Sequence, residues 1–183
     1  MDTVAVAARL RRYEGSVPHM YKCTGGEVTV GVGHAMQSAA EASALAWVIG
    51  GGPAADTVAA DYGRVSAAPK GMVAGFYASL TQCRMGDSDI EALVESDIVS
   101  FEGQLRRALP RWDSYPETVR EALFDMAFNL GLGGLMKFPA MLKAVDAGDW
   151  ATAAAQSHRL GIGDERNRET ANLFQQGAAT AAG

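Results

Sequence analysis

Cysteine, histidine and surplus positive charge are all scarce in this 183-residue chain, and each shortage excludes a kind of site. The two cysteines, Cys23 and Cys83, lie far apart, and neither has a Cys or His at the spacing of a zinc site. The histidines, His19, His34 and His158, are scattered as well. We therefore predict no metal and no cofactor, and a disulfide between the two cysteines is left as an alternative.

Basic side chains are outnumbered by acidic ones, which gives a net charge of −5. A nucleic-acid partner is not expected, because binding phosphates requires a basic face. No apolar stretch approaches the ~20 residues of a bilayer-spanning helix, so membrane insertion is not expected either. No charged, apolar and small-residue leader opens the chain, and we expect synthesis in the cytoplasm without a signal peptide.

The overall composition is that of an ordinary folded protein. Hydrophobic residues make up 48% of the chain and charged residues 20%. A chain of this length buries a sizeable core. We predict one domain, a monomer, whose core is divided between two lobes.

The most informative segment of the chain is the run from Tyr13 to His34. Apolar residues recur at helical spacing up to Tyr13, and Gly15 then ends the pattern as a helix stop does. Glu14 is therefore expected at the end of a helix, at the mouth of the segment that follows.

A hairpin is predicted directly after this helix. Gly25 and Gly26 supply a tight turn, because glycine reaches positive φ at low cost. The residues after the turn alternate, with Val28, Val30 and Val32 on one face and Glu27, Thr29 and Gly31 on the other. This pattern predicts a half-buried strand in which Thr29 and Glu27 face away from the valines.

The rest of the chain is predicted to be helical. Residues 37–72 show little periodicity, and Gly50 to Pro53 break any helix there. Two capping boxes, Ser88 to Glu91 and Ser114 to Glu117, are expected to open helices. The first continues as an apolar stripe to Leu109, and the second contains an apolar segment, 123–130, in which Phe128 and Leu130 are expected to be core residues. Further helices are predicted after Pro139, at Trp150 and from Asp164.

The run around Glu14 resembles the active-site segment of the phage-type lysozymes (glycoside hydrolase family 24). The family's motif is Glu, eight residues, Asp, five residues, Thr; here it reads Glu14, Cys23 and Thr29, with cysteine in place of Asp. Residues 122–150 and 168–174 are similar to the family's C-terminal lobe, whereas residues 37–85 match no part of it that we can place.

The resemblance implies an α+β, mainly α fold of two lobes. A hairpin-containing lobe of about residues 14–85 would be joined by a connecting helix, about 88–109, to a helical lobe of residues 110–183 together with the N-terminal helix. The implied activity is that of a peptidoglycan N-acetylmuramidase, which hydrolyses the β-1,4 bond between N-acetylmuramic acid and N-acetylglucosamine.

The family's catalytic roles carry over to three positions. Glu14 corresponds to the general acid, and Thr29 to the residue that positions water. Cys23 stands where the base lies, and a thiol acts as base or nucleophile only as a thiolate, which Lys22, the neighbouring helix ends or His19 could favour. Base is the preferred role, and nucleophile and spectator are the alternatives. Glu27, on the side of Thr29, is a smaller alternative as a stand-in carboxylate.

The resemblance also assigns substrate-binding positions: Gly33, His34, Asn129, Arg166 and Arg168. One of the two arginines is expected to lie near the acid. His34 is expected to pair with Asp97. Asn129 is left between binding substrate amides and capping the turn at Gly131.

The implied partner is the glycan strand of peptidoglycan in the periplasm of a host or target bacterium. The user of the activity is left open between a phage endolysin and an antibacterial effector toxin, the latter part of a larger secreted chain or countered by an immunity protein. A catalytically impaired peptidoglycan-binding or assembly protein is the alternative from another class.

Overall fold

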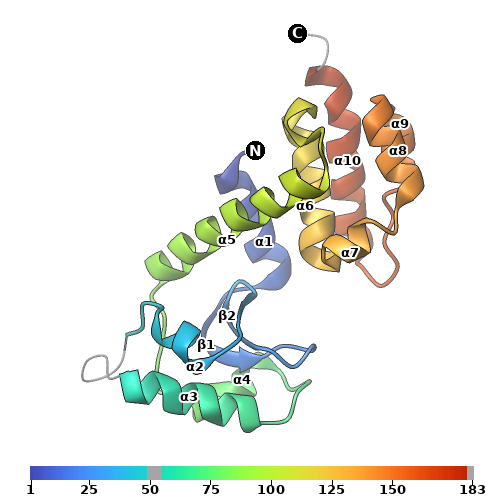
Figure 1. The fold of residues 1–183 in the computed structure, drawn as a ribbon. Helices are drawn as coiled ribbons and strands as arrows, with labels where there is room; N and C mark the ends of the chain where they lie inside the picture. Colours follow the sequence, from blue (N-terminus) through green and yellow to red (C-terminus); the bar gives the residue numbers. More distant parts are fainter. Residues whose placement is uncertain (49–54, 181–183) are drawn as a thin grey trace. The chain divides into compact units, whose positions relative to one another are not determined.

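The computed structural model describes residues 1–48 and 55–180, and it is mainly helical with one small antiparallel sheet (Figure 1). The predicted α+β, mainly α class is confirmed. The predicted break at Gly50 to Pro53 lies outside the described residues. The helices are α1 (Thr3–Glu14), α2 (Ala39–Ser43), α3 (Ala55–Ala67), α4 (Ala74–Tyr77), α5 (Asp87–Ala108), α6 (Glu117–Leu130), α7 (Leu132–Leu135), α8 (Pro139–Ala147), α9 (Trp150–Ala155) and α10 (Asp164–Thr180). Two 3-10 turns, η1 (Ala78–Leu80) and η2 (Trp112–Ser114), complete the set.

The chain divides into two compact units. One, the hairpin unit, comprises Ala7–Asp97; the other, the helical unit, comprises Met1–Val6 and the chain from Ile98 onward. Helices α1 and α5 each contribute residues to both units. In the described residues no helix combines the length and the apolar character that a bilayer span needs.

The hairpin unit is built on three strands, β1 (Val17–Lys22), β2 (Val28–Gly31) and β3 (His34–Met36), in the order β1-β2-β3. Helix α1 ends at Glu14, and Gly15 follows with a φ of +76°, so the predicted helix stop is confirmed. Gly26 has a φ of +104°, and its N–H donates to the Cys23 carbonyl at 3.0 Å. The predicted glycine turn therefore joins β1 to β2.

The prediction that β2 is half-buried is wrong, because all four of its residues are buried. On the Thr29 side, the position that a Gly31 side chain would occupy lies 3.5 Å from Ile90 of α5. At Gly31, a helix residue therefore covers the face that the alternating pattern assigned to solvent. Thr29 is only 2% exposed.

Residues 78–85, which the sequence could not place, are tied to α3 by one buried carboxylate. Asp61 accepts the backbone N–H groups of Gln82 and Cys83 at 2.7 and 2.8 Å and pairs with Arg64. Because an unpaired buried charge is costly, these bonds fix the path of the segment. The same segment returns to the sheet, where the Met85 N–H donates to the Pro18 carbonyl at 2.7 Å.

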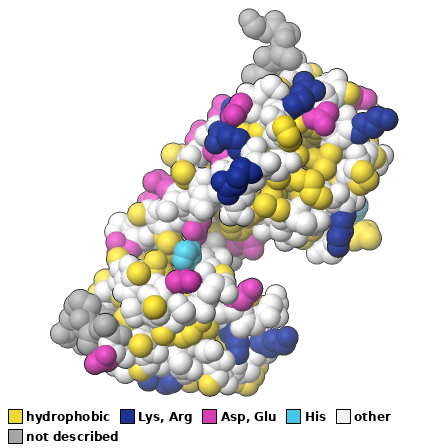
Figure 2. Space-filling view, viewed as in Figure 1, with side chains coloured by type: hydrophobic (Ala, Val, Ile, Leu, Met, Phe, Trp, Pro, Cys, Tyr) yellow, Lys and Arg dark blue, Asp and Glu magenta, His cyan; other side chains and the backbone are white. Residues whose placement is uncertain are grey.

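The helical unit is organised around α6, in which Val119 and residues 121–127 are buried. The prediction that Phe128 and Leu130 are core residues is wrong, because both are only half-buried. Phe128 stacks on the buried Phe124, with ring centroids 5.9 Å apart, at the edge of the core. Helices α8 to α10 carry many small apolar residues, and Figure 2 shows hydrophobic side chains at the surface over them, with Lys and Arg side chains nearby.

Candidate active site

The hairpin places Tyr21, Cys23, Glu27 and Thr29 on one face. Tyr21 lies directly opposite Thr29, and Lys22 lies opposite Val28. One position further along, the Cys23 N–H donates to the Glu27 carbonyl at 3.0 Å, so these two residues also face each other. Side chains alternate along a strand and cross-strand partners share a face, so these four side chains form one group and Lys22 belongs to the opposite face.

The Glu27 backbone and side chain connect the members of this group. Its carbonyl accepts hydrogen bonds from the Cys23 N–H and from the Thr29 hydroxyl, whose Oγ1 lies 3.1 Å away. Its carboxylate accepts a hydrogen bond from the Cys23 thiol, with Sγ and Oε2 3.3 Å apart. The geometry of the turn therefore depends on the residue at position 27 as much as on the motif residues.

Gly25 leaves room for this contact. A Cβ at position 25 would lie 3.1 Å from Glu27 Oε2 and 3.5 Å from Cys23 Sγ. The first distance is tighter than almost all natural Cβ contacts, so a side chain here would displace the carboxylate. The absence of a side chain at Gly25 is thus a local requirement of the Cys23–Glu27 pair.

Glu14 is brought close to this face at the end of α1. The pKa of the Tyr21 hydroxyl is raised, first by burial and then by electrostatic interaction with Cys23 and Glu14. Tyr21 therefore lies within electrostatic reach of both groups. Sequence reasoning missed Tyr21, although its position two residues before Cys23 on an alternating strand is a signal that would have found it.

The motif residues differ in their access to solvent. Glu14 is exposed, Cys23 is partly exposed and Thr29 is buried. Both cysteines are free thiols, so the disulfide alternative is not supported. Cys83 is fully buried beside Asp61, and burial together with that carboxylate raises the pKa of its thiol to about 12.

The two cations predicted to favour a Cys23 thiolate are engaged elsewhere. The Lys22 ammonium donates to the carbonyls of Ser66 and Ala68, at 2.6 and 2.9 Å. The His19 ring pairs with the Ala74 carbonyl at 2.9 Å. Neither side chain bonds to Cys23, whose thiol contacts an acid instead.

His34 pairs with Asp97 of α5, as the resemblance implied. His34 Nδ1 lies 3.0 and 2.9 Å from the two carboxylate oxygens. Gly33, just before it, has a φ of +85° that a residue with a side chain rarely adopts. This pair attaches the end of the hairpin to the first half of α5.

Arg166 and Arg168, on α10 of the helical unit, have different surroundings. Arg166 is buried, and its Nε donates to Asp125 Oδ1 at 3.0 Å. The same carboxylate accepts from the buried Arg159 at 2.9 Å. Asp125 thus fixes the guanidinium of Arg166, whereas Arg168 is exposed. Asn129 makes no bond to the Gly131 turn, and among the described residues its buried Oδ1 has no hydrogen-bond partner.

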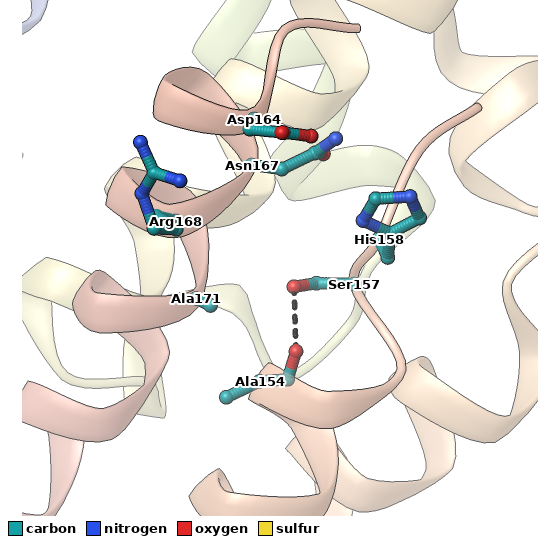
Figure 3. Close-up of a pocket in the computed structure, with 7 residues that line it drawn as sticks. All are labelled: Ala154, Ser157, His158, Asp164, Asn167, Arg168 and Ala171. Atoms are coloured by element: carbon teal, nitrogen blue, oxygen red, sulfur yellow. Dashed lines mark hydrogen bonds between the residues drawn. The ribbon is translucent and has the colours of Figure 1, made fainter. Parts of the chain in front are cut away.

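Arg168 borders a polar pocket of about 240 Å³ in the helical unit. Figure 3 shows Asp164 and Asn167 of α10 on one side of this pocket and His158 on the other. The Ser157 hydroxyl at its floor donates to the Ala154 carbonyl at 2.8 Å, and Asn167 bonds to the backbone of Arg159. Two of its polar side chains, Ser157 and Asn167, are thus occupied by internal bonds. Across the part of the chain that the structure describes, no three His, Cys, Asp or Glu side chains are grouped to hold a metal ion.

Comparison with known proteins agrees with this geometry. A family model described as phage lysozyme matches residues 11–171, a span that includes the hairpin, the unplaced residues 37–85 and α10 up to Ala171. The chain is also 29% identical, over 154 residues, to the pre-baseplate central spike protein Gp5 of Enterobacteria phage T4. That alignment covers 82% of this chain and 23% of the spike protein, so the chain spans about a quarter of this relative's length.

Proposed function

The chain belongs to the phage lysozyme family, and from this premise we propose that it is a peptidoglycan N-acetylmuramidase. At family level, a peptidoglycan hydrolase of the muramidase type is supported. The proposed reaction hydrolyses the β-1,4 bond between N-acetylmuramic acid and N-acetylglucosamine. The observation that carries the proposal is the single hairpin face that gathers Cys23, Glu27 and Thr29 while Tyr21 interacts with Glu14.

Glu14 is the proposed general acid. It lies at the end of α1, where a protonated carboxyl can reach a bound sugar and donate to the glycosidic oxygen as the bond breaks. Thr29 is proposed to hold the attacking water. Its hydroxyl hydrogen is donated to the Glu27 carbonyl, so the lone pairs of Oγ1 are available to accept from water. The group that activates this water is proposed to come from the Cys23–Glu27 pair.

The proposed substrate is the glycan strand of peptidoglycan. Gly33, His34, Asn129, Arg166 and Arg168 are kept as proposed substrate-binding residues. Of the two arginines, Arg168 is exposed and open to a ligand, whereas Arg166 is buried against Asp125.

The proposed setting is the cell wall of a host or target bacterium, with the protein acting as a phage endolysin or as an antibacterial effector. The similarity to a central spike protein favours a further candidate setting, in which the lysozyme is carried on a larger assembly. The alternative from another class is a peptidoglycan-binding protein with impaired catalysis.

Glu14→Gln tests the enzyme proposal against the binding alternative. Glutamine keeps the size of the side chain but cannot donate a proton of useful acidity. Release of reducing sugar ends from purified sacculi should therefore fall by at least ~100-fold, while thermal unfolding stays unchanged. A folded Glu14→Gln protein that turns over sacculi like the wild type contradicts the assignment, and a wild type that binds sacculi without releasing sugar ends supports the binding protein.

A further inference from the structure

The hairpin face contains a carboxylate that the motif positions do not include. The Glu27 carboxylate is exposed and accepts the thiol hydrogen bond of Cys23, with Sγ and Oε2 3.3 Å apart. The carboxylate lies over the turn beside Gly25, so a Cβ at position 25 would be 3.1 Å from Glu27 Oε2. Glu27 is therefore held toward Cys23, not extended into solvent.

The chemistry of a thiol and a carboxyl group decides which of the two carries charge. Carboxyl groups are ordinarily much stronger acids than thiols, so a carboxylate is the more common base of the two chemical types. The Cys23 sulfur lies 3.3 Å from Glu27 Oε2, a distance at which a thiol can donate to the carboxylate. The cations that would favour a thiolate, Lys22 and His19, bond to backbone carbonyls elsewhere.

We propose that Glu27, the exposed carboxylate of this face, is the general base of the reaction and that Cys23 is a positioning residue that holds its carboxylate. This inference rests on the proposed muramidase function, and it names the residue that would act as the base in that reaction. The carboxylate missing at position 23 is then supplied by the residue directly across the turn, on the same face as Thr29.

The proposed step balances in protons and bonds. Glu14 donates its proton to the glycosidic oxygen as the bond from the anomeric carbon to that oxygen breaks. Water held between Thr29 and Glu27 forms the new bond to the anomeric carbon and passes one proton to the Glu27 carboxylate. The reaction ends with Glu14 ionised and Glu27 protonated, and solvent exchange restores both. Attack from the face opposite the leaving group gives an inverted product.

The primary experiment compares four proteins on purified sacculi: wild type, Glu27→Gln, the double variant Cys23→Asp with Glu27→Gln, and Glu95→Gln. Glu27→Gln should lower turnover by ~100-fold or more, the usual worth of a general base. The double variant returns a carboxylate to the same face and should recover to within about tenfold of wild type. Glu95, an exposed residue of α5 in the same unit, is the matched control and should leave turnover unchanged.

Two further variants separate the carboxylate from its support. Gly25→Ala leaves Glu27 and the net charge intact but crowds Oε2, and it should lower turnover by about tenfold through misplacement alone. Cys23→Ser keeps a hydrogen-bond donor and should stay within about tenfold of wild type. A positioning thiol also predicts that kcat/KM does not climb between pH 7 and 9, whereas a thiolate base makes it climb until the thiol is ionised.

The outcomes distinguish this inference from the proposed function. A folded Glu27→Gln protein within threefold of wild type overturns the inference, and so does a loss that Cys23→Asp does not restore. If wild type releases sugar ends, Glu14→Gln is inactive and Glu27→Gln is active, only the assignment of the base fails. If wild type releases no sugar ends, the muramidase proposal fails with it.

Discussion

Cys83 differs from Cys23 in every respect that controls reactivity. It is fully buried, its backbone N–H donates to Asp61, and it lies far from the hairpin turn in sequence. The thiol is therefore a packing residue, and its ionisation opposes the fold, because a thiolate there would be desolvated beside a carboxylate. The sequence alone gave no way to tell the two cysteines apart except by the motif.

This burial predicts an alkaline loss of stability. The thiol's pKa is raised from 9.0 to about 12 in the folded chain, so the unfolded chain releases the proton first as pH rises. The stabilisation is fully present below pH 9 and is lost between pH 9 and 12, with a slope of at most ~1.4 kcal/mol per pH unit for one group. Urea unfolding midpoints between pH 8 and 10.5 measure it.

Cys83→Ala is the control for this prediction. It should be less stable than wild type at pH 8 because buried volume is lost, but its stability should fall less steeply above pH 9. Burial also raises the pKa of Tyr21 and Tyr115, which keeps some alkaline slope in both proteins. Parallel pH curves for wild type and Cys83→Ala would contradict the role of the thiol.

At the scale of elements, the helices could be predicted better than their first turns. The apolar stripe from Ile90 does form one helix, but α5 begins at Asp87 and not at Ser88. The Met85 N–H is held by the Pro18 carbonyl, and the Gly86 carbonyl accepts the N–H groups of Asp89 and Ile90 in the first turn. Ser114 belongs to the 3-10 turn η2, and α6 begins only at Glu117 with Pro116 at its N-cap, so Ser114 does not occupy the capping position. The capping boxes failed because a tertiary bond at α5 and a local 3-10 turn before α6 set where the two helices start.

The packing of α10 against α6 gives a test at this scale. Gly177 of α10 is buried, and a Cβ there would lie 2.6 Å from Val119 Cγ2 and 3.2 Å from Trp150. Gly177→Ala gains about 1 kcal/mol of helix propensity but costs roughly 1–3 kcal/mol of overpacking against a short, branched side chain. We expect a net loss of about 1 kcal/mol in the free energy of urea unfolding.

Gly103 of α5 is the matched helix glycine. The nearest atom to a Cβ at that position is Arg107 Nη1, 3.9 Å away, which is ordinary contact. Gly103→Ala should therefore stabilise the protein by about 0.5–1 kcal/mol. Stabilisation by both substitutions would show that α10 shifts to admit the methyl group and that its close approach to α6 is not required.

At the scale of the whole molecule, the fold class and the location of the motif on a helix end and a hairpin could be predicted from the sequence. The contacts among the side chains of the candidate site could not. Glu14, Cys23 and Thr29 follow from spacing, because a helix stop and a glycine turn fix the hairpin locally. The Cys23–Glu27 bond and the Tyr21–Thr29 pair required the register of β1 on β2, and the covering of Gly31 required the approach of Ile90. These features depend on side-chain conformation and on residues distant in sequence.

The chain's net charge of −5 predicts how it meets the proposed peptidoglycan substrate. Bacterial walls are anionic, so long-range repulsion should slow encounter at low salt. Raising the ionic strength from 0.01 to 0.15 M shortens the screening length from ~30 to ~8 Å. We therefore expect kcat/KM on sacculi to rise several-fold over this range, the opposite of the behaviour of a basic enzyme. A fall in kcat/KM on sacculi would mean that a local basic surface, not the net charge, governs association.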